Sequence, residues 1–231
     1  MDPLHLTYAA LLLLSISYPL LKSFESKLQM WRKWKYMIPA ILLTAIPFIT
    51  WDVWFARHGV WSFNHDYVTG WFVLSLPWEE WLFFILVPYA CFFIYEAVNH
   101  FYPRIRTYMA FSVVHWVIFM AVLYLAFRNW DKTYTAVAFF SASFILLVTG
   151  LLKQTALLLP RFYLVFFISL IPFFLINGIL TALPVVMYND AENLGIRLIT
   201  IPVEDAVYLL TLLMMNFGIY EGLKKHFSST F

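Results

Sequence analysis

Charged side chains are scarce in this 231-residue chain. Only 12% of its residues are Asp, Glu, Lys or Arg, whereas soluble domains carry about 25%. Hydrophobic residues make up 63% of the chain, and its mean hydropathy is +0.78. So few charges cannot cover a surface that faces water, which excludes a soluble globular domain and a disordered segment. The composition instead predicts an integral membrane protein built mainly of helices.

Cysteine and glycine are scarce too. Cys91 is the single cysteine, which excludes an internal disulfide and a thiolate metal cluster. None of the seven glycines are spaced as in a dinucleotide- or phosphate-binding loop, so no flavin or nucleotide domain of the usual kind is expected. No histidine pair has metal-ligand spacing beside an acid, and we expect neither a metal nor a cofactor. The net charge of +2 gives no reason to expect a nucleic-acid partner.

Seven apolar stretches are long enough to cross a bilayer, which takes about 20 residues. They cover residues 5–22, 36–55, 77–98, 107–127, 133–152, 161–182 and 199–222. The first stretch is not expected to be a cleaved signal peptide, because no Lys or Arg precedes it. The sequence thus predicts an all-α polytopic membrane protein with seven transmembrane helices.

Basic residues between these spans predict the orientation. With the N-terminus outside, eleven of the fifteen Lys and Arg residues fall on the cytoplasmic side. These are Lys22, Lys27, Arg32, Lys33, Lys35, Arg104, Arg106, Lys153, Arg161, Lys224 and Lys225. The other side receives Arg57, Arg128, Lys132 and Arg197. We therefore expect a cytoplasmic C-terminus, in what we interpret as a bacterial inner membrane.

The chain repeats itself at a fixed offset of 125 residues. The identical pairs are Pro47/Pro172, Asn64/Asn189, Gly70/Gly195, Pro77/Pro202, Glu79/Glu204, Tyr95/Tyr220 and Glu96/Glu221. Because the fifth span lies four crossings after the first, both copies point the same way across the membrane. The repeat predicts two parallel three-helix units, residues 1–106 and 133–231, joined by a linker helix within 107–132.

The clearest motif opens the third and the seventh span. It reads Pro77-x-Glu79-Glu80 in the first copy and Pro202-x-Glu204-Asp205 in the second. A proline and acids suit the first turn of any helix, so ordinary capping is one interpretation. The adjacent acids nevertheless have aromatic rather than basic neighbours, and ionisable groups inside a span are functional candidates by default. We favour the functional interpretation.

The topology brings further residues toward these acids. Asp52 and its repeat partner Asn177 fall near the same outer end of their spans. The candidate acid–base residues are Glu79, Glu204, Glu80 and Asp205. The candidate substrate-binding residues are Asp52, Asn177, Asn64, Asn189, Trp51, Trp81, Phe83, Phe84 and Tyr208. A buried acid beside aromatic rings can protonate an alkene and hold the resulting cation, which is acid–base chemistry on a hydrocarbon dissolved in the bilayer.

At these two motifs the chain resembles the membrane-integral lycopene cyclases. Their hallmark is Pro-x-Glu followed by Glu or Asp, once in each half. The segments from Gly59 to Gly70, Pro88-Tyr89 and Tyr95-Glu96 also resemble that family. The likeness covers essentially the whole chain, including its three-one-three arrangement of spans.

This resemblance implies a lycopene β-cyclase that forms ionone-type end rings without net redox, in carotenoid biosynthesis. It implies Glu79 and Glu204 as leading acid–base residues, followed by Glu80 and Asp205, and lycopene or a related carotenoid in the bilayer as the substrate. One ring or two, the oligomeric state and association with other carotenoid-pathway enzymes stay open. The alternatives are a related carotenoid hydratase and a proton-coupled transporter. A retinal receptor is set aside, because the seventh span has no lysine for a Schiff base.

Overall fold

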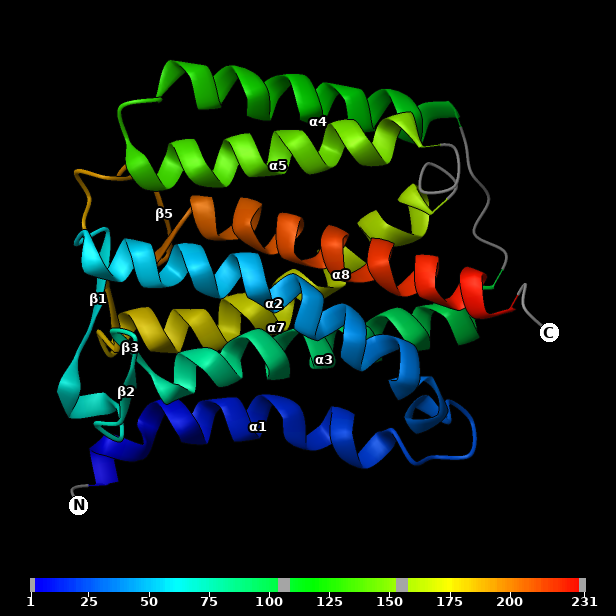
Figure 1. Cartoon of the computed structure of the whole chain (residues 1–231), viewed down its shortest axis with the longest axis horizontal. Helices are drawn as coiled ribbons and strands as arrows, with labels where there is room; N and C mark the ends of the chain where they lie inside the picture. The colour runs from blue at the N-terminus through cyan, green and yellow to red at the C-terminus, as the bar shows by residue number, and fades with distance from the viewer. Residues whose placement is uncertain (1–2, 104–108, 153–157, 229–231) are drawn as a thin grey trace.

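Long helices account for most of the chain in the computed structural model, which describes residues 3–103, 109–152 and 158–228 (Figure 1). Short 3-10 turns, Pro3–Leu6 and Met30–Lys33, precede the first two helices. The helices are α1 (Thr7–Lys22), α2 (Trp34–Arg57), α3 (Trp78–Phe101), α4 (Met109–Arg128), α5 (Thr133–Leu151), α7 (Leu159–Ala182) and α8 (Glu204–Ser228). The all-α polytopic class predicted from the sequence is confirmed.

Six of these helical segments are long and apolar enough to cross a membrane. They are Leu4–Lys22, Met30–Arg57, Trp78–Phe101, Thr133–Leu151, Leu159–Ala182 and Glu204–Phe227. The described apolar stretch of α4, Ser112–Arg128, is shorter. The boundary between the first unit and the linker at residues 106 and 107 lies outside the described residues, and the division into two units and a linker stays a prediction.

The helices of the two halves interlock. Within each half, α1 packs on α3 and α5 packs on α8, whereas α2 packs mainly on α8 and α7 on α3 of the other half. The second helix of each half therefore lies against the third helix of the other. Helix α4 lies at the edge of the bundle, against α5 (Figure 1). His115 of α4 joins this layer to the rest, because its ring nitrogens bond the Tyr163 hydroxyl and the Leu146 carbonyl, each at 2.8 Å.

Short strands gather at one end of the bundle, which we call the strand end (Figure 1). Strand β1 (Trp61–Phe63) pairs antiparallel with β4 (Val186–Tyr188), and two hairpins pair β2 (Phe72–Val73) with β3 (Leu76–Pro77) and β5 (Arg197–Leu198) with β6 (Ile201–Pro202). The prediction from sequence contains helices only, so these strands are additional to it. The predicted seventh span, 199–222, consequently began too early, because Ile201–Pro202 is extended and α8 begins at Glu204.

The β1–β4 ribbon joins the two halves about an approximate twofold axis. Ser62 lies opposite Met187, its repeat equivalent, at the centre of the ribbon. On either side the backbone bonds match: Asn64 N donates to Val185 O at 3.0 Å, and Asn189 N donates to Val60 O at 2.9 Å. The two donors are repeat equivalents, 125 residues apart, and so are the two acceptors. Backbone pairing between the halves therefore follows the sequence repeat.

At the opposite end of α3 and α8, the two halves are joined by a pair of equivalent side-chain hydrogen bonds. Tyr95 donates to Glu221 Oε1 at 3.0 Å, and Tyr220 donates to Glu96 Oε1 at 2.6 Å. Glu96 also pairs with Lys33. The Tyr-Glu dipeptide of each repeat thus ties its helix to the other half, which supports a structural role for both acids.

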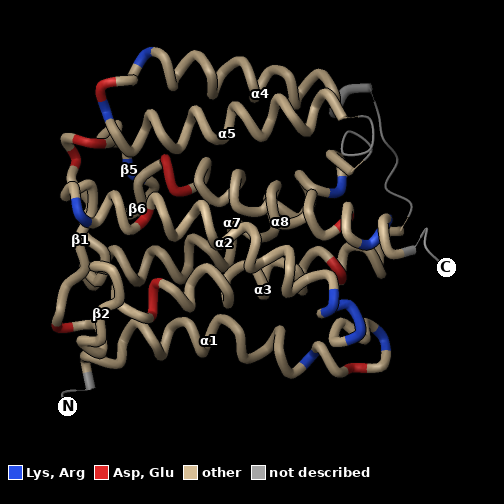
Figure 2. Tube along the Cα trace, viewed as in Figure 1, with Lys and Arg blue, Asp and Glu red and all other residues tan. Residues whose placement is uncertain are grey.

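Basic residues concentrate at the end of the bundle opposite the strands (Figure 2). Arg104, Arg106 and Lys153, which were counted among the cytoplasmic residues above, lie outside the described residues. Lys22, Lys27, Arg32, Lys33 and Lys35 lie on or near the turn between α1 and α2 at this end. We propose that this basic end faces the cytoplasm.

A cysteine-accessibility experiment tests this orientation. With Cys91→Ser as background, Arg128→Cys should react with a membrane-impermeant maleimide added to intact bacterial cells from which the outer membrane has been removed. Lys27→Cys should react only after the cells are opened. Both native side chains are exposed, so the side of the membrane on which each residue lies decides whether the reagent reaches it. Labelling of Lys27→Cys alone in intact cells would reverse the assignment.

Candidate active site

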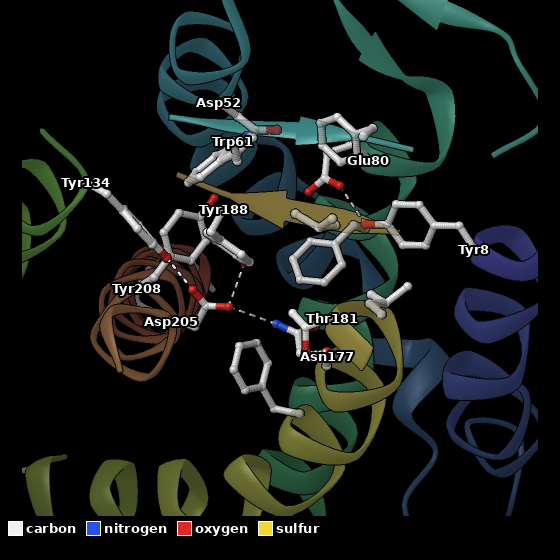
Figure 3. Close-up of a pocket in the computed structure, with 15 residues that line it drawn as sticks. Tyr8, Asp52, Trp61, Glu80, Tyr134, Asn177, Thr181, Tyr188, Asp205 and Tyr208 are labelled. Atoms are coloured by element: carbon white, nitrogen blue, oxygen red, sulfur yellow. Dashed lines mark hydrogen bonds between the residues drawn. The ribbon is translucent and has the colours of Figure 1, made fainter. Parts of the chain in front are cut away.

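A narrow cavity at the strand end brings together three carboxyl groups from different helices (Figure 3). They belong to Asp52 of α2, Glu80 of α3 and Asp205 of α8, which are 1%, 8% and 3% exposed. The cavity has a volume of about 50 Å³ and lies against the β1–β4 ribbon, which contributes Trp61, Phe63, Val186 and Tyr188 to its lining. Residues far apart in sequence therefore form one acidic site inside an apolar bundle.

The two acids of each motif point to different places. Successive residues of an α-helix are turned by about 100° around its axis, so adjacent side chains face different neighbours. Glu80 and Asp205, the second acids of the two motifs, line the cavity, whereas Glu79 and Glu204 do not. The second acids are thus the ones in position to meet a molecule there.

The first acids instead hold the loops that precede the hairpins. Glu79 Oε1 accepts a hydrogen bond from Thr69 N at 2.8 Å, and Glu204 Oε1 accepts one from Leu194 N at 2.7 Å. Thr69 and Leu194 are themselves repeat equivalents, and both glutamates are 0% exposed. Glu204 Oε1 also accepts from the Thr135 hydroxyl at 2.6 Å. The geometry around these two acids is that of buried loop anchors.

Tyrosines from the first helix of each half hold the second acids. Tyr8 of α1 donates to Glu80 Oε2 and Tyr134 of α5 donates to Asp205 Oδ1, both at 2.6 Å (Figure 3). The two tyrosines lie 126 residues apart, one more than the repeat offset, so an ungapped comparison of the halves misses them. Allowing a single-residue shift would have revealed the pair.

Asp205 is the most heavily hydrogen-bonded of the three acids. Besides Tyr134, it accepts from the Tyr188 hydroxyl at 2.8 Å and from Asn177 Nδ2 at 3.5 Å, both at Oδ2. Burial, reinforced by the nearby Asp205 carboxylate, raises the pKa of the Tyr188 phenol well above its usual value, so this hydroxyl remains a donor. Both carboxyl oxygens of Asp205 thus accept hydrogen bonds from side-chain donors.

Asp52 has a contrasting environment. Its carboxyl lies beside the Trp61 indole and near Glu80 (Figure 3), and Asp52 Oδ2 has no hydrogen-bond partner within the described part of the chain. The Asp52 carboxyl therefore has fewer hydrogen-bond donors around it than the Asp205 carboxyl. Its repeat equivalent is Asn177, an amide that donates to Asp205. The repeat therefore departs from symmetry at the site itself.

Some of the residues predicted from the sequence line the cavity and others do not. Those that line it are Asp52, Glu80, Phe83, Asn177, Asp205 and Tyr208. Those that do not are Trp51, Asn64, Glu79, Trp81, Phe84, Asn189 and Glu204. Lining residues that the sequence analysis did not select as candidates include Tyr8, Trp61, Tyr134, Phe173 and Tyr188. Of these residues, only Tyr8 and Tyr134 could have been found from the sequence, through a repeat offset of 126 residues in place of 125.

The predicted aromatic residues outside the cavity pack behind it or face away. The Trp51 ring packs edge-on against Tyr208 at 5.2 Å between centroids, and Phe84 packs edge-on against Phe83 at 5.6 Å. Trp81 Nε1 donates to Val73 O at 3.3 Å, beside the β2–β3 hairpin. These rings therefore support the lining or the hairpin and do not form the wall themselves.

Asn64 and Asn189 form the same local turn in both halves. Asn64 Oδ1 accepts from Asp66 N at 3.0 Å, and Asn189 Oδ1 accepts from Ala191 N at 3.1 Å. An asparagine that accepts a bond from the backbone two residues ahead stabilises a turn. This bonding accounts for the repetition of both residues without contact to the cavity.

Within the described ranges, no group of three His, Cys, Asp or Glu side chains is arranged to hold a metal ion. Asp52, Glu80 and Asp205 are among the residues covered by this statement. Independently of this, buried carboxyl groups can donate and accept protons, so the three acids can carry out acid–base chemistry.

Comparison with known proteins places this site in a family. The family model described as "Lycopene cyclase" matches residues 5–98 and 131–223, which is most of the chain. Both Pro-x-Glu motifs, all three cavity carboxyls and the β1–β4 ribbon lie inside the matched segments. No solved structure gives a significant match.

Curated relatives include two longer fungal proteins, each named bifunctional lycopene cyclase/phytoene synthase. The protein of Neurospora crassa is 29% identical over 91 residues, which are 39% of this chain and 14% of that protein. The protein of Aspergillus oryzae is 29% identical over 62 residues, which are 27% of this chain and 11% of that protein. The matches thus cover only a small part of each relative.

The loop-anchoring geometry predicts how the first acids respond to substitution. Glu79→Ala and Glu204→Ala remove the acceptor of a loop N–H, which costs about 1–3 kcal/mol where the donor is buried. At about 2–4 °C per kcal/mol for a chain of this size, the melting temperature in detergent should fall by several degrees. Glu79→Gln and Glu204→Gln keep an acceptor oxygen and should melt closer to the wild type. Scanning fluorimetry measures all four variants.

Glu25→Ala is the control for this series. Glu25 forms a surface ion pair with Lys22 at 3.3 Å, and such pairs contribute about 0–1 kcal/mol. Its melting temperature should barely change. Ala variants at positions 79 and 204 that melt like the wild type would contradict the anchoring role.

Proposed function

Because this chain belongs to the lycopene cyclase family, we propose that it closes β-ionone-type rings at the ends of lycopene by proton transfer, without net redox. One observation carries the proposal: three buried carboxyls from three helices face a single aromatic-lined cavity inside a bundle of membrane-spanning helices. A hydrocarbon substrate dissolves in the bilayer and reaches such a site without crossing water. Matches with the fungal relatives cover only part of those proteins, so lycopene as substrate belongs to this proposal.

The hydrogen bonding of the three acids suggests a division of roles. Asp52 and Glu80 lie close enough for their charges to interact, and two neighbouring buried carboxyls retain a proton between them. Asp205 accepts bonds from three side chains, which favours its carboxylate. We therefore assign the proton source to the Asp52–Glu80 side of the cavity and the proton acceptor to Asp205.

The reaction then follows in three balanced steps. A carboxyl O–H bond breaks and its proton forms a C–H bond with the terminal double bond of an end group, which leaves a tertiary cation. The neighbouring internal double bond attacks this cation, so a C–C bond closes the ring and the positive charge moves into it. An adjacent ring C–H bond then gives its proton to Asp205, and its electron pair restores a double bond. The product is an isomer of the substrate.

Aromatic rings are placed to stabilise the cation between these steps. Phe83, Phe173 and Tyr208 line the cavity together with the ribbon residues Trp61 and Tyr188. A ring face attracts a cation by about 0.5–2 kcal/mol, with the larger values where water is absent. The β1–β4 ribbon also limits access of water to the cation, which favours proton loss over the hydration that a carotenoid hydratase would catalyse.

Expression in a bacterium that accumulates lycopene tests the activity. Membranes carrying this chain should convert lycopene to cyclic carotenes without added reduced flavin. In D₂O each new ring should carry one additional deuterium, because one C–H bond forms from an exchangeable acid. Chromatography with mass spectrometry separates the outcomes: unchanged lycopene with confirmed expression contradicts the proposal, and a product heavier by one water per end group indicates a hydratase.

Substitution of the second acids tests the assignment of roles. Glu80→Gln and Asp205→Asn keep the size of the side chain but cannot transfer a proton. General acid–base catalysis contributes about 10²–10⁴-fold, so each variant should lose cyclisation by that order. Glu79→Gln, one residue away, is the matched control and should retain most activity at equal protein level in the membrane. The reverse order of effects would place the proton transfer on the first acids.

A further inference from the structure

A second, apolar groove leads away from the acid cavity along α1, α3 and α7. It has a volume of about 210 Å³ and shares two lining residues with the acid cavity, Phe173 and Asn177. The two spaces therefore meet at these side chains. Small residues at the groove, Ala90, Cys91 and Ser169, leave room between α3 and α7.

The far rim of this groove faces the surroundings of the bundle. Leu14 of α1 and Leu175 of α7 line it and are 67% and 65% exposed. Both helices qualify as membrane-spanning segments, so these exposed leucines face lipid. The groove is thus a lateral opening toward the acyl chains, with the three acids behind it.

The groove is elongated parallel to the helices. Its lining on α3 runs from Val87 to Ile94, about 10 Å at 1.5 Å per residue, and Ile94 lies fourteen residues, about 21 Å, beyond Glu80 of the acid cavity. The cavity and the groove together therefore reach along about two thirds of the bilayer's hydrocarbon thickness of about 30 Å. An extended polyene therefore fits parallel to the helices with only one end inside the acid cavity.

The equivalent place in the other half is filled. Trp51 occupies the repeat position of Ile176, and its ring packs on Phe48 at 4.5 Å between centroids. Both rings also pack on Tyr208, at 5.2 and 5.0 Å. The twofold repeat thus presents an open groove on the side of α1, α3 and α7 and a closed cluster of aromatic rings on the other side.

Another apolar groove, between α2 and α3, does not lead to the acids. It is lined by residues such as Thr50, Leu74 and Ile85 and shares no lining residue with the acid cavity. Its residues therefore provide control positions for experiments on the groove between α1, α3 and α7.

We propose that the polyene chain of a linear carotene lies in the groove between α1, α3 and α7 while one of its ends occupies the acid cavity. This inference rests on the proposed function for the identity of the substrate. Its consequence is that both ends of a carotene use one opening. To receive a second ring, the molecule leaves the groove, turns round in the bilayer and enters again, so a one-ring product is released into the membrane between the two reactions.

Blocking the groove tests the proposal through activity. Ala90→Phe places a ring between α3 and α7 and should lower conversion of lycopene by at least about tenfold, the effect of roughly 1.4 kcal/mol. Ala121→Phe makes the same change on the exposed side of α4 and should convert lycopene like the wild type. Equal activity of both variants, at equal protein level in the membrane, would overturn the proposal.

Thiol protection tests occupancy without relying on turnover. In a Cys91→Ser background, Leu175→Cys marks the rim of the proposed groove and Thr50→Cys marks the groove between α2 and α3. Reaction of Leu175→Cys with a lipid-soluble maleimide should slow at least about threefold when the vesicles contain lycopene, whereas Thr50→Cys should react at an unchanged rate. Protection of Thr50→Cys alone, or of neither, would overturn the proposal.

The two readouts separate this inference from the proposed function. Protection of Leu175→Cys by lycopene in vesicles where the wild type forms no ring would support the groove and contradict the cyclase activity. Normal ring formation by Ala90→Phe, together with unprotected Leu175→Cys, would support the activity and contradict the groove.

Discussion

Three carboxyl groups that share one cavity inside a membrane bundle are the constraint around which this structure is organised. Lipid offers no hydrogen bonds, so each polar group must find partners within the protein or remain neutral. Tyr8, Tyr134, Tyr188 and Asn177 meet that need for Glu80 and Asp205. Each of these bonds lies within one half, and the ribbon and the interlocked helices bring the two bonded acids to a single cavity where the halves meet.

The sequence predicted the helical spans well, because long apolar runs are unambiguous in so uncharged a chain. It also located the two acid pairs. It could not decide which acid of each pair faces the cavity, since that depends on where α3 and α8 begin and on their rotation. The pairing of Trp61 with Tyr188 was equally hidden, because strands of three residues carry no periodic signal and aromatic residues make up 21% of the chain.

Symmetry of the scaffold and asymmetry of the site have separate physical origins. The two halves exchange equivalent hydrogen bonds at two places: backbone bonds at the ribbon and side-chain bonds at the Tyr-Glu exchange between α3 and α8. Asn177 in place of a second aspartate avoids a fourth carboxyl at the cavity, which would add repulsion among like charges. Trp51 in place of Ile176 fills one side of the bundle. A duplicated framework thus holds a single, unduplicated acidic cavity.

The β1–β4 ribbon has a consequence for the newly made chain. Its two strands lie 125 residues apart, and ribosomes add about 5–20 residues per second, so β1 emerges roughly 6–25 s before β4 exists. During that interval β1 has no partner strand, and Glu80 and Asp52 lie in a half-built bundle. The first three helices must therefore persist in the membrane as an incomplete intermediate, and the backbone bonds of the ribbon form only after Tyr188 has been made.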